Sequence, residues 1–180
     1  MLDGVRVLVA GVGNIFLGDD GFGSEVARRL AGRRVPDGVR VTDYGIGGIH
    51  LAYDLLGDLE LLVLVDALSR GVAPGTVCLV EVGDVQTSSS AAVGHGNDLE
   101  HVGVDSHAMD PASVFASVKG LGGTLPPTVV VGCEPAEVSE QIGLSPVVEA
   151  AVEPTVQQIL ELVAKHVAAN AQPALAPDRS

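Results

Sequence analysis

Two segments of the sequence are almost wholly apolar and rich in β-branched residues, VRVLVAG at 5–11 and LLVLVDA at 61–67. Successive side chains of a strand point to opposite faces of its sheet, so a run that is apolar at nearly every position predicts a strand buried on both faces. Such strands are typical of parallel sheets covered by helices on both sides. These two segments therefore indicate an α/β architecture.

The rest of the chain alternates between strand-like and helical patterns. Further strands are predicted at 39–44, 76–82 and 128–133, and helices at 23–32, 47–58, 110–123 and 145–170. This alternation predicts a three-layer α/β sandwich, with a five-stranded, twisted, mostly parallel sheet and helices on both faces. Residues 68–75 are too few for a crossover connection, so we expect the fourth strand to run antiparallel to the third.

The length predicts a single domain, which we place at residues 1–170. Within it, residues 83–105 are polar and rich in Ser and Gly, which is typical of a long loop. Residues 171–180 form a Pro/Ala-rich tail that we expect to be disordered. Pro154 predicts that the last helical segment is kinked or divided into two helices.

The net charge, the length of the apolar runs and the few cysteines limit the partners and the cellular location that we expect. A formal net charge of −13 argues against a nucleic-acid partner. No apolar run reaches the roughly 18–20 residues that a membrane span needs, and the first residues lack the pattern of a secretory signal. We therefore expect a cytoplasmic protein. Cys78 and Cys133 lie in strand-like segments, which favours buried thiols over a disulfide or a metal pair.

The turn between the first strand and the first helix, GVGNIFLGDDGFG at 11–23, is unusually rich in glycine. It does not fit the dinucleotide-binding pattern, because Gly11 and Gly13 are followed by Phe16 where the third glycine belongs. Asp19 and Asp20 would also repel a phosphate at the helix N-terminus. Capping of the helix accounts for one of these two acidic residues, but not for the glycines around them.

Several carboxylates and one imidazole follow the predicted strands. Asp20 lies just past the first strand, Asp43 ends the second, Asp66 ends the third, and His107 lies in a loop before a helix. In a doubly wound fold the loops at these strand ends share one crevice. Two carboxylates and a histidine can bind a divalent transition metal and leave positions open for a further ligand. From spacing alone, a metal site and separate capping or strand-ending roles both stay open.

The sequence resembles the nickel–iron hydrogenase maturation proteases over residues 5 to about 163. The resemblance is carried by GVGNIFLGDDGFG, DYGIGGIHL, VDAL, DSHAMDPASVF and GCEPAEVSEQIGLSPVVEAAV, in that order. Any one of these motifs would be weak support. Five separated motifs in the family's order make coincidence an unsatisfactory explanation.

The resemblance implies roles for particular residues. The family's metal ligands fall on Asp20, Asp66 and His107, and these would bind nickel that arrives with the substrate rather than a permanently held ion. Asp43 matches an acidic position near the family's site, where a supporting role, a catalytic role and a simple strand-ending role are all open. Asp19 is better interpreted as a cap or supporting group than as a ligand.

The resemblance also implies an activity, that of an endopeptidase that recognises nickel in the precursor of the hydrogenase large subunit and removes its C-terminal extension. Asp20, Asp66, His107 and Asp43 are the candidate catalytic residues, with water as the simplest nucleophile. We expect a monomer or a weak oligomer. The alternatives are a non-catalytic, nickel-dependent chaperone of the precursor and a nucleotide-binding α/β enzyme.

Overall fold

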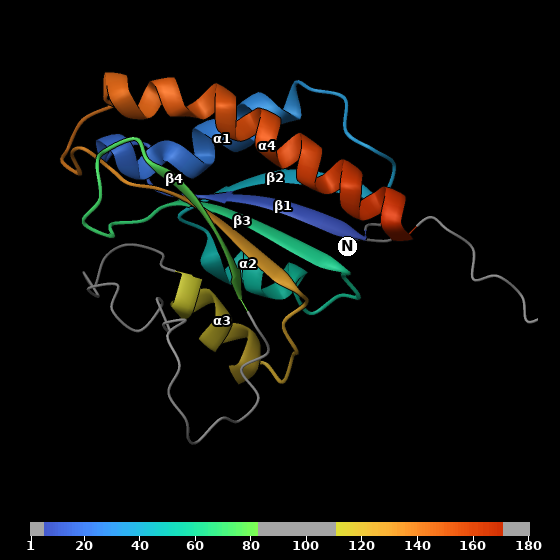
Figure 1. Cartoon of the computed structure of the whole chain (residues 1–180). Coiled ribbons are helices and arrows are strands. Elements are labelled where there is room, and N and C mark those ends of the chain that lie inside the picture. Colours follow the sequence, from blue (N-terminus) through green and yellow to red (C-terminus); the bar gives the residue numbers. More distant parts are fainter. Residues whose placement is uncertain (1–5, 83–110, 171–180) are drawn as a thin grey trace, which may run out of the picture.

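We describe residues 6–82 and 111–170 in a computed structural model of the chain (Figure 1). The elements are β1 (Val7–Val12), the 3-10 helix η1 (Gly18–Gly21), α1 (Phe22–Ala31), β2 (Val39–Gly45), α2 (Gly48–Asp54), β3 (Leu61–Ala67), β4 (Val77–Val82), α3 (Pro111–Gly120), β5 (Thr128–Cys133) and α4 (Pro146–Asn170). All five predicted strands are present, and their ends differ from the prediction by at most two residues. The short helix η1 was not predicted.

The five strands form one sheet in the order β2-β1-β3-β5-β4. β1 is parallel to both β2 and β3, β3 is parallel to β5, and β4 is antiparallel to β5. The expected reversal of β4 relative to β3 is therefore confirmed, although β5 lies between them. The β3–β4 connection passes the end of β5, where Leu68 N–H donates to Cys133 O at 2.9 Å and Gly75 N–H donates to Glu134 O at 2.8 Å.

Helices cover both faces of the sheet, as Figure 1 shows, with α1 and α4 on one side and α2 and α3 on the other. All residues of β1 are buried, as is β3 from Leu61 to Asp66. Odd-numbered residues of β1 such as Val9 pack in the core under α1 and α4, and even-numbered ones such as Leu8 pack under α2 and α3. The predicted three-layer α/β sandwich, with central strands buried on both faces, is confirmed.

Two helix predictions need correction. The second predicted helix is shorter than 47–58, because α2 ends at Asp54. The last segment is a single helix that continues through Pro154, so its division into two helices is wrong. Pro154 is exposed, whereas Val152 and Val156 on either side of it are fully buried. Packing of this apolar face keeps the helix continuous despite the local cost of a proline.

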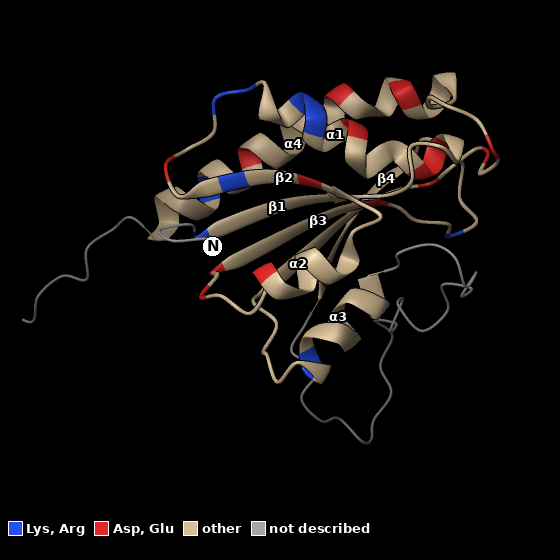
Figure 2. Ribbon diagram, turned by 180° about the vertical axis from the view of Figure 1, so that it is seen from behind, with Lys and Arg blue, Asp and Glu red and all other residues tan. Residues whose placement is uncertain are grey.

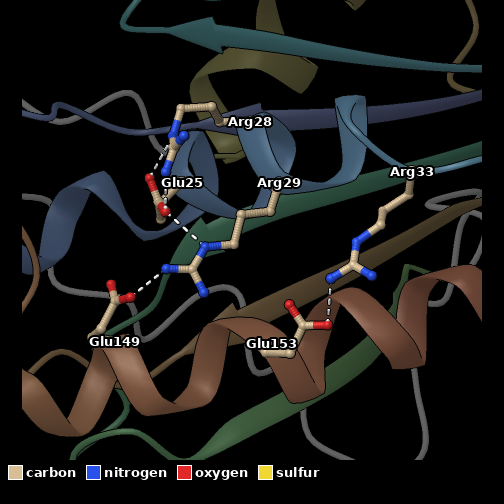
Figure 3. Close-up of polar contacts among 6 residues, drawn as sticks. All are labelled: Glu25, Arg28, Arg29, Arg33, Glu149 and Glu153. Atoms are coloured by element: carbon tan, nitrogen blue, oxygen red, sulfur yellow. Dashed lines mark hydrogen bonds and ion pairs between the residues drawn. The ribbon is translucent and has the colours of Figure 1, made fainter.

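Arginines of α1 and of the segment that follows it contact α4 through ion pairs (Figure 3). Arg29 contacts Glu25 of its own helix and Glu149 of α4, and Arg33 lies 2.7 Å from Glu153. These pairs are at the surface, above the buried contact between the two helices. The buried side chains, not the ion pairs, are therefore the main source of the stability of this contact.

Some predictions concern residues outside the described ranges. They are the loop at 83–105, the tail at 171–180 and the position of His107. Within the described ranges, no helix combines the length and the apolar character that crossing a membrane requires.

Candidate active site

Glycines bring the β1–α1 turn into close contact with the carboxyl ends of β1 and β3. A side chain at Gly23 would place its Cβ 2.1 Å from Val65 O and 2.2 Å from Val12 O. Gly13 has a φ of +133°, and a Cβ there would lie 1.9 Å from Asp20 O. Only glycine permits this packing. The turn is thereby held against the edge of the sheet where the parallel strands end.

Asp20 lies in η1, on this turn, and is partly exposed. Its Oδ2 accepts a hydrogen bond from the backbone N–H of Asn14 at 2.7 Å. In a phosphate-binding turn, such an N–H would face the anion. Here that N–H instead donates to the carboxylate of Asp20. This agrees with the interpretation that the glycines do not form a phosphate site.

Asp66 is the penultimate residue of β3 and is only 5% exposed. Its Oδ1 accepts a hydrogen bond from Ala67 N–H at 2.8 Å. β3 pairs directly with β1, and η1 packs against β3, so Asp20 and Asp66 belong to adjoining elements at one edge of the sheet. By strand alternation, Asp66 belongs to the face covered by α2 and α3, like Leu64.

Asp43 lies at the same edge on the opposite side of β1, where it is paired in register with Gly11. Its Oδ1 accepts hydrogen bonds from Ser24 Oγ at 2.8 Å and from Gly45 N–H at 2.9 Å. The hydroxyl of Ser24 also lies 3.3 Å from Gly13 O. Asp43 is therefore held toward α1, on the other face of the sheet from Asp66.

His107 lies outside the described residues, so its position relative to the two carboxylates stays a prediction. Within residues 6–82 and 111–170, no three His, Cys, Asp or Glu side chains are grouped to hold a metal. Carboxylates favour divalent ions of harder character, and an imidazole would extend this preference to nickel or zinc. Asp20 and Asp66 are chemically suited to such an ion but need a third ligand from elsewhere.

Asp19 has a different role from its neighbour. It is fully buried and accepts hydrogen bonds from the backbone N–H groups of Ala136 at 2.8 Å, Glu137 at 3.0 Å and Ser145 at 2.6 Å, and from Ser145 Oγ at 2.9 Å. Burial by itself raises the pKa of Asp19, but these hydrogen bonds outweigh it and hold the pKa below its ordinary value of 3.8. The carboxylate therefore joins the β1–α1 turn to the β5–α4 connection, and it makes no side-chain cap of η1 or α1.

Sequence analysis assigned no role to Glu134, the first residue after β5, which is 6% exposed. Its carboxylate accepts hydrogen bonds from the backbone N–H groups of Arg70 at 2.6 Å and Gly71 at 3.2 Å. It thus fixes the β3–β4 connection, which begins directly after Ala67. In the sequence, Glu134 differs in no visible way from Asp43 and Asp66, which are also carboxylates at strand ends. Its contact with the β3–β4 connection was therefore not predictable.

Cys133 is not suited to act as a nucleophile. Both are free, Cys133 is buried and Cys78 is partly buried, so the expectation of buried thiols holds fully for Cys133 alone. Burial, with a smaller effect from the charge of Asp19, raises the pKa of Cys133 to about 12. Such a thiol stays protonated at neutral pH and is unreactive.

Comparison with known proteins points to one family. Residues 24–162 match the family model described as hydrogenase maturation protease, HycI. The chain is 29% identical over 157 residues to the hydrogenase 2 maturation protease of Escherichia coli K12, covering 87% of this chain and 89% of that relative. It is 30% identical over 163 residues to a putative hydrogenase maturation protease of Methanocaldococcus jannaschii, covering 88% and 97%.

Solved structures agree with this relationship. A solution structure of an endopeptidase from E. coli superposes with a TM-score of 0.73 at 29% identity, covering 90% of this chain and 94% of that one. The hydrogenase-maturating endopeptidase HybD from E. coli gives a TM-score of 0.68 at 28% identity, with the same coverage. This chain belongs to the hydrogenase maturation protease family and is an endopeptidase.

Proposed function

We propose that this endopeptidase removes the C-terminal extension of a nickel–iron hydrogenase large-subunit precursor, and that it recognises nickel already bound by that precursor. Asp20, Asp66 and His107 bind the nickel of the substrate. The observation that carries this proposal is the pair of carboxylates, Asp20 and Asp66, on adjoining elements at the edge where the parallel strands end.

The position of α3 supports the inclusion of His107. α3 begins at Pro111, four residues after His107, and its buried residues pack in the core on the face to which Asp66 belongs. α3 leads into β5, and its first turn lies toward the carboxyl ends of the parallel strands (Figure 1). We therefore expect Asp66 and the segment that precedes α3, which contains His107, to lie on the same face of the sheet and at the same ends of its strands.

Water is the nucleophile in this proposal. Among the described residues, Cys133 is buried and protonated, and the buried hydroxyl of Ser24 donates to Asp43. The substrate's nickel polarises the carbonyl of the bond to be cut, and carboxylate ligands hold the precursor in register. Asp43 either activates the water or fixes the turn that carries Asp20. Its hydrogen bonds from Ser24 and Gly45 favour the second role.

The test uses the purified protein and its large-subunit precursor, with nickel and without it. We expect cleavage only of the nickel-loaded precursor, with the new C-terminus defined by mass spectrometry. Asp20→Asn and Asp66→Asn should lower the rate at least about 100-fold, as expected for loss of a metal-contacting group. Asp58→Asn is the matched control, because Asp58 is exposed and precedes β3 at the opposite edge of the sheet.

Each alternative outcome identifies a different error. Equal cleavage of nickel-free precursor would contradict nickel recognition but leave the peptidase activity intact. Tight, nickel-dependent binding of the precursor without any cut would indicate the chaperone. Thermal stabilisation by nucleotides, and not by nickel, would support the nucleotide-binding enzyme.

A further inference from the structure

The three most exposed large apolar side chains of the described residues, and a fourth beside one of them, gather at the edge of the sheet that carries Asp20. Ile142 is 81% exposed, Ile46 is 69%, Phe16 is 61%, and Ile15 beside it is 51%. We call these four residues the apolar rim. They come from three separate connections, β1–η1, β2–α2 and β5–α4. Exposed apolar side chains that gather in this way mark interaction surfaces.

Hydrogen bonds between the three connections hold the apolar rim in place. Gly13 N–H donates to Gly45 O at 3.0 Å, which joins the first connection to the second. Gln141 N–H donates to Phe16 O at 3.0 Å, and Gly18 N–H donates to Gln141 O at 2.9 Å, which joins the first to the third. The buried carboxylate of Asp19 reinforces this second junction.

The backbone of Phe16 is fixed at both its polar groups, because its N–H also donates to Asn14 Oδ1 at 3.0 Å. Its ring is therefore exposed on a well-held segment. A partner that covers it would have to order little of this chain, which favours binding. Rigid aromatic side chains of this kind commonly dominate interface energies.

The three connections that form the apolar rim are acidic. No Lys or Arg occurs in residues 11–24, 43–48 or 132–149. Asp20, Asp43, Glu137 and Glu140 lie in these segments, and the last two are exposed. In Figure 2 the ends of the parallel strands carry red ribbon, and the basic residues at the start of β1 and in and before β2 lie at the opposite edge. Arg70 of the β3–β4 connection lies at the same end of the sheet as the rim, where its backbone N–H donates to Glu134.

We propose that the apolar rim docks the segment of the precursor that carries the scissile bond, and that this segment is apolar with basic residues beside it. This inference rests on the proposed function. The rim borders the candidate site on two sides, since Phe16 and Asp20 share one turn and Ile46 follows Asp43 on another. A segment held there passes the carboxylates, and its basic residues meet the acidic surroundings.

The first test is the double variant Phe16→Ser/Ile142→Ser, assayed for cleavage of nickel-loaded precursor. We expect KM to rise at least about tenfold while kcat stays within about twofold, because both side chains contribute to docking and neither reacts. Leu121→Ser is the matched control, since Leu121 is also exposed, at 43%, but follows α3 away from this edge. It should leave KM unchanged. Because these positions are exposed, we expect the variants to keep the fold, and their thermal midpoints test this.

The second test reverses one charge. Glu140→Lys should raise KM several-fold, whereas Glu161→Lys, an exposed position in the second half of α4, should not. Unchanged KM in the double variant would overturn the docking surface, and unchanged KM in Glu140→Lys would overturn the basic character of the segment. If the wild-type protein does not cut the precursor, the proposed function fails. Binding of immobilised precursor by the same variants then still decides the docking surface.

Discussion

The hydroxyl of Ser24 lies 2.8 Å from Oδ1 of Asp43, so the start of α1 is joined to the end of β2 across the turn that carries Asp20. The same oxygen of Asp43 accepts the N–H of Gly45 at 2.9 Å. One carboxylate oxygen thus fixes both the helix and the beginning of the β2–α2 connection. Substitution by Asn can therefore distinguish a positioning role of Asp43 from a chemical one. The amide oxygen of Asn can accept the same two hydrogen bonds, but the amide cannot act as a base.

Asp43→Asn is expected to keep both the stability and the activity, with kcat within about fivefold of wild type. The retained Oδ1 continues to accept from Ser24 and Gly45, and Asp43 lies on the other face of the sheet from Asp66. Asp43→Ala removes both bonds and should cost about 1–2 kcal/mol of stability. Rates and urea unfolding of the two variants provide the measurement. A loss in kcat of a hundredfold or more in Asp43→Asn would identify Asp43 as the general base.

Asp19→Ala is expected to destabilise the protein by about 3 kcal/mol, since it removes the shared acceptor of four partly buried hydrogen bonds. The pKa of Asp19 is lowered in the folded state, so the unfolded chain binds the proton more readily. The stabilisation is therefore complete above the ordinary value of 3.8 and is lost as the pH falls through the lower, folded-state pKa. Urea unfolding at pH 7 and near pH 3 should show a smaller difference between wild type and variant at the acidic pH. An unchanged difference would contradict the role of the ionised carboxylate.

Gly23→Ala is expected to cost about 3 kcal/mol, because its Cβ would meet two backbone oxygens that cannot move aside, Val65 O and Val12 O. Gly120→Ala is the matched control, since nothing lies within 4 Å of a Cβ there. It ends α3 and should instead be neutral or slightly stabilising, by up to about 1 kcal/mol. Thermal or urea unfolding distinguishes them, and equal effects would show that the turn does not pack as described.

Replacement of Arg29 by Gln is expected to cost only about 0.5–1 kcal/mol, although Arg29 contacts both Glu25 and Glu149 (Figure 3). These side chains are partly in water, where ion pairs contribute little and salt weakens them further. A double-mutant cycle of Arg29→Gln and Glu149→Gln, at low and high NaCl, measures the pair. A coupling energy that does not fall with salt would contradict this account.

The isolated protein is expected to bind added Ni²⁺ reversibly, with a Kd of about 1 μM or weaker, because three side chains do not complete the coordination of the ion. Calorimetry before and after treatment with a chelator measures this affinity. His107→Ala should weaken it further and abolish cleavage while the thermal midpoint stays near that of wild type. Stoichiometric nickel that resists the chelator would instead indicate a permanently bound metal.

Local patterns were sufficient to predict most of the fold. The apolar runs at 5–11 and 61–67 identified the two central strands, and the short connection at 68–75 predicted the reversal of β4. It did not show that β5 lies between β3 and β4, because strand order depends on pairing between distant segments. Pro154 was misleading for a related reason. Proline locally disfavours a continuous helix, but the tertiary packing of α4 outweighs this preference.

The candidate site was predictable only in part. Fold topology placed Asp20, Asp43 and Asp66 at one edge, but hydrogen bonds hold Asp43 toward α1, away from the face of Asp66. Neither the buried role of Asp19 nor that of Glu134 could be inferred from neighbouring residues. Asp19 bonds residues 117 to 126 positions away, and Glu134 bonds residues 63 to 65 positions away.

The distance in sequence between Asp19 and Ser145 also determines when the edge can be completed during synthesis. A ribosome-bound chain has β1, β2 and β3 available early, yet the β1–α1 turn stays without its buried partner until residue 145 has emerged. Contacts of such high sequence separation form late and slowly compared with local ones. The surface proposed to receive the precursor is therefore among the last parts of the molecule to form, and a partly synthesised chain would display the carboxylates before it could hold a substrate against them.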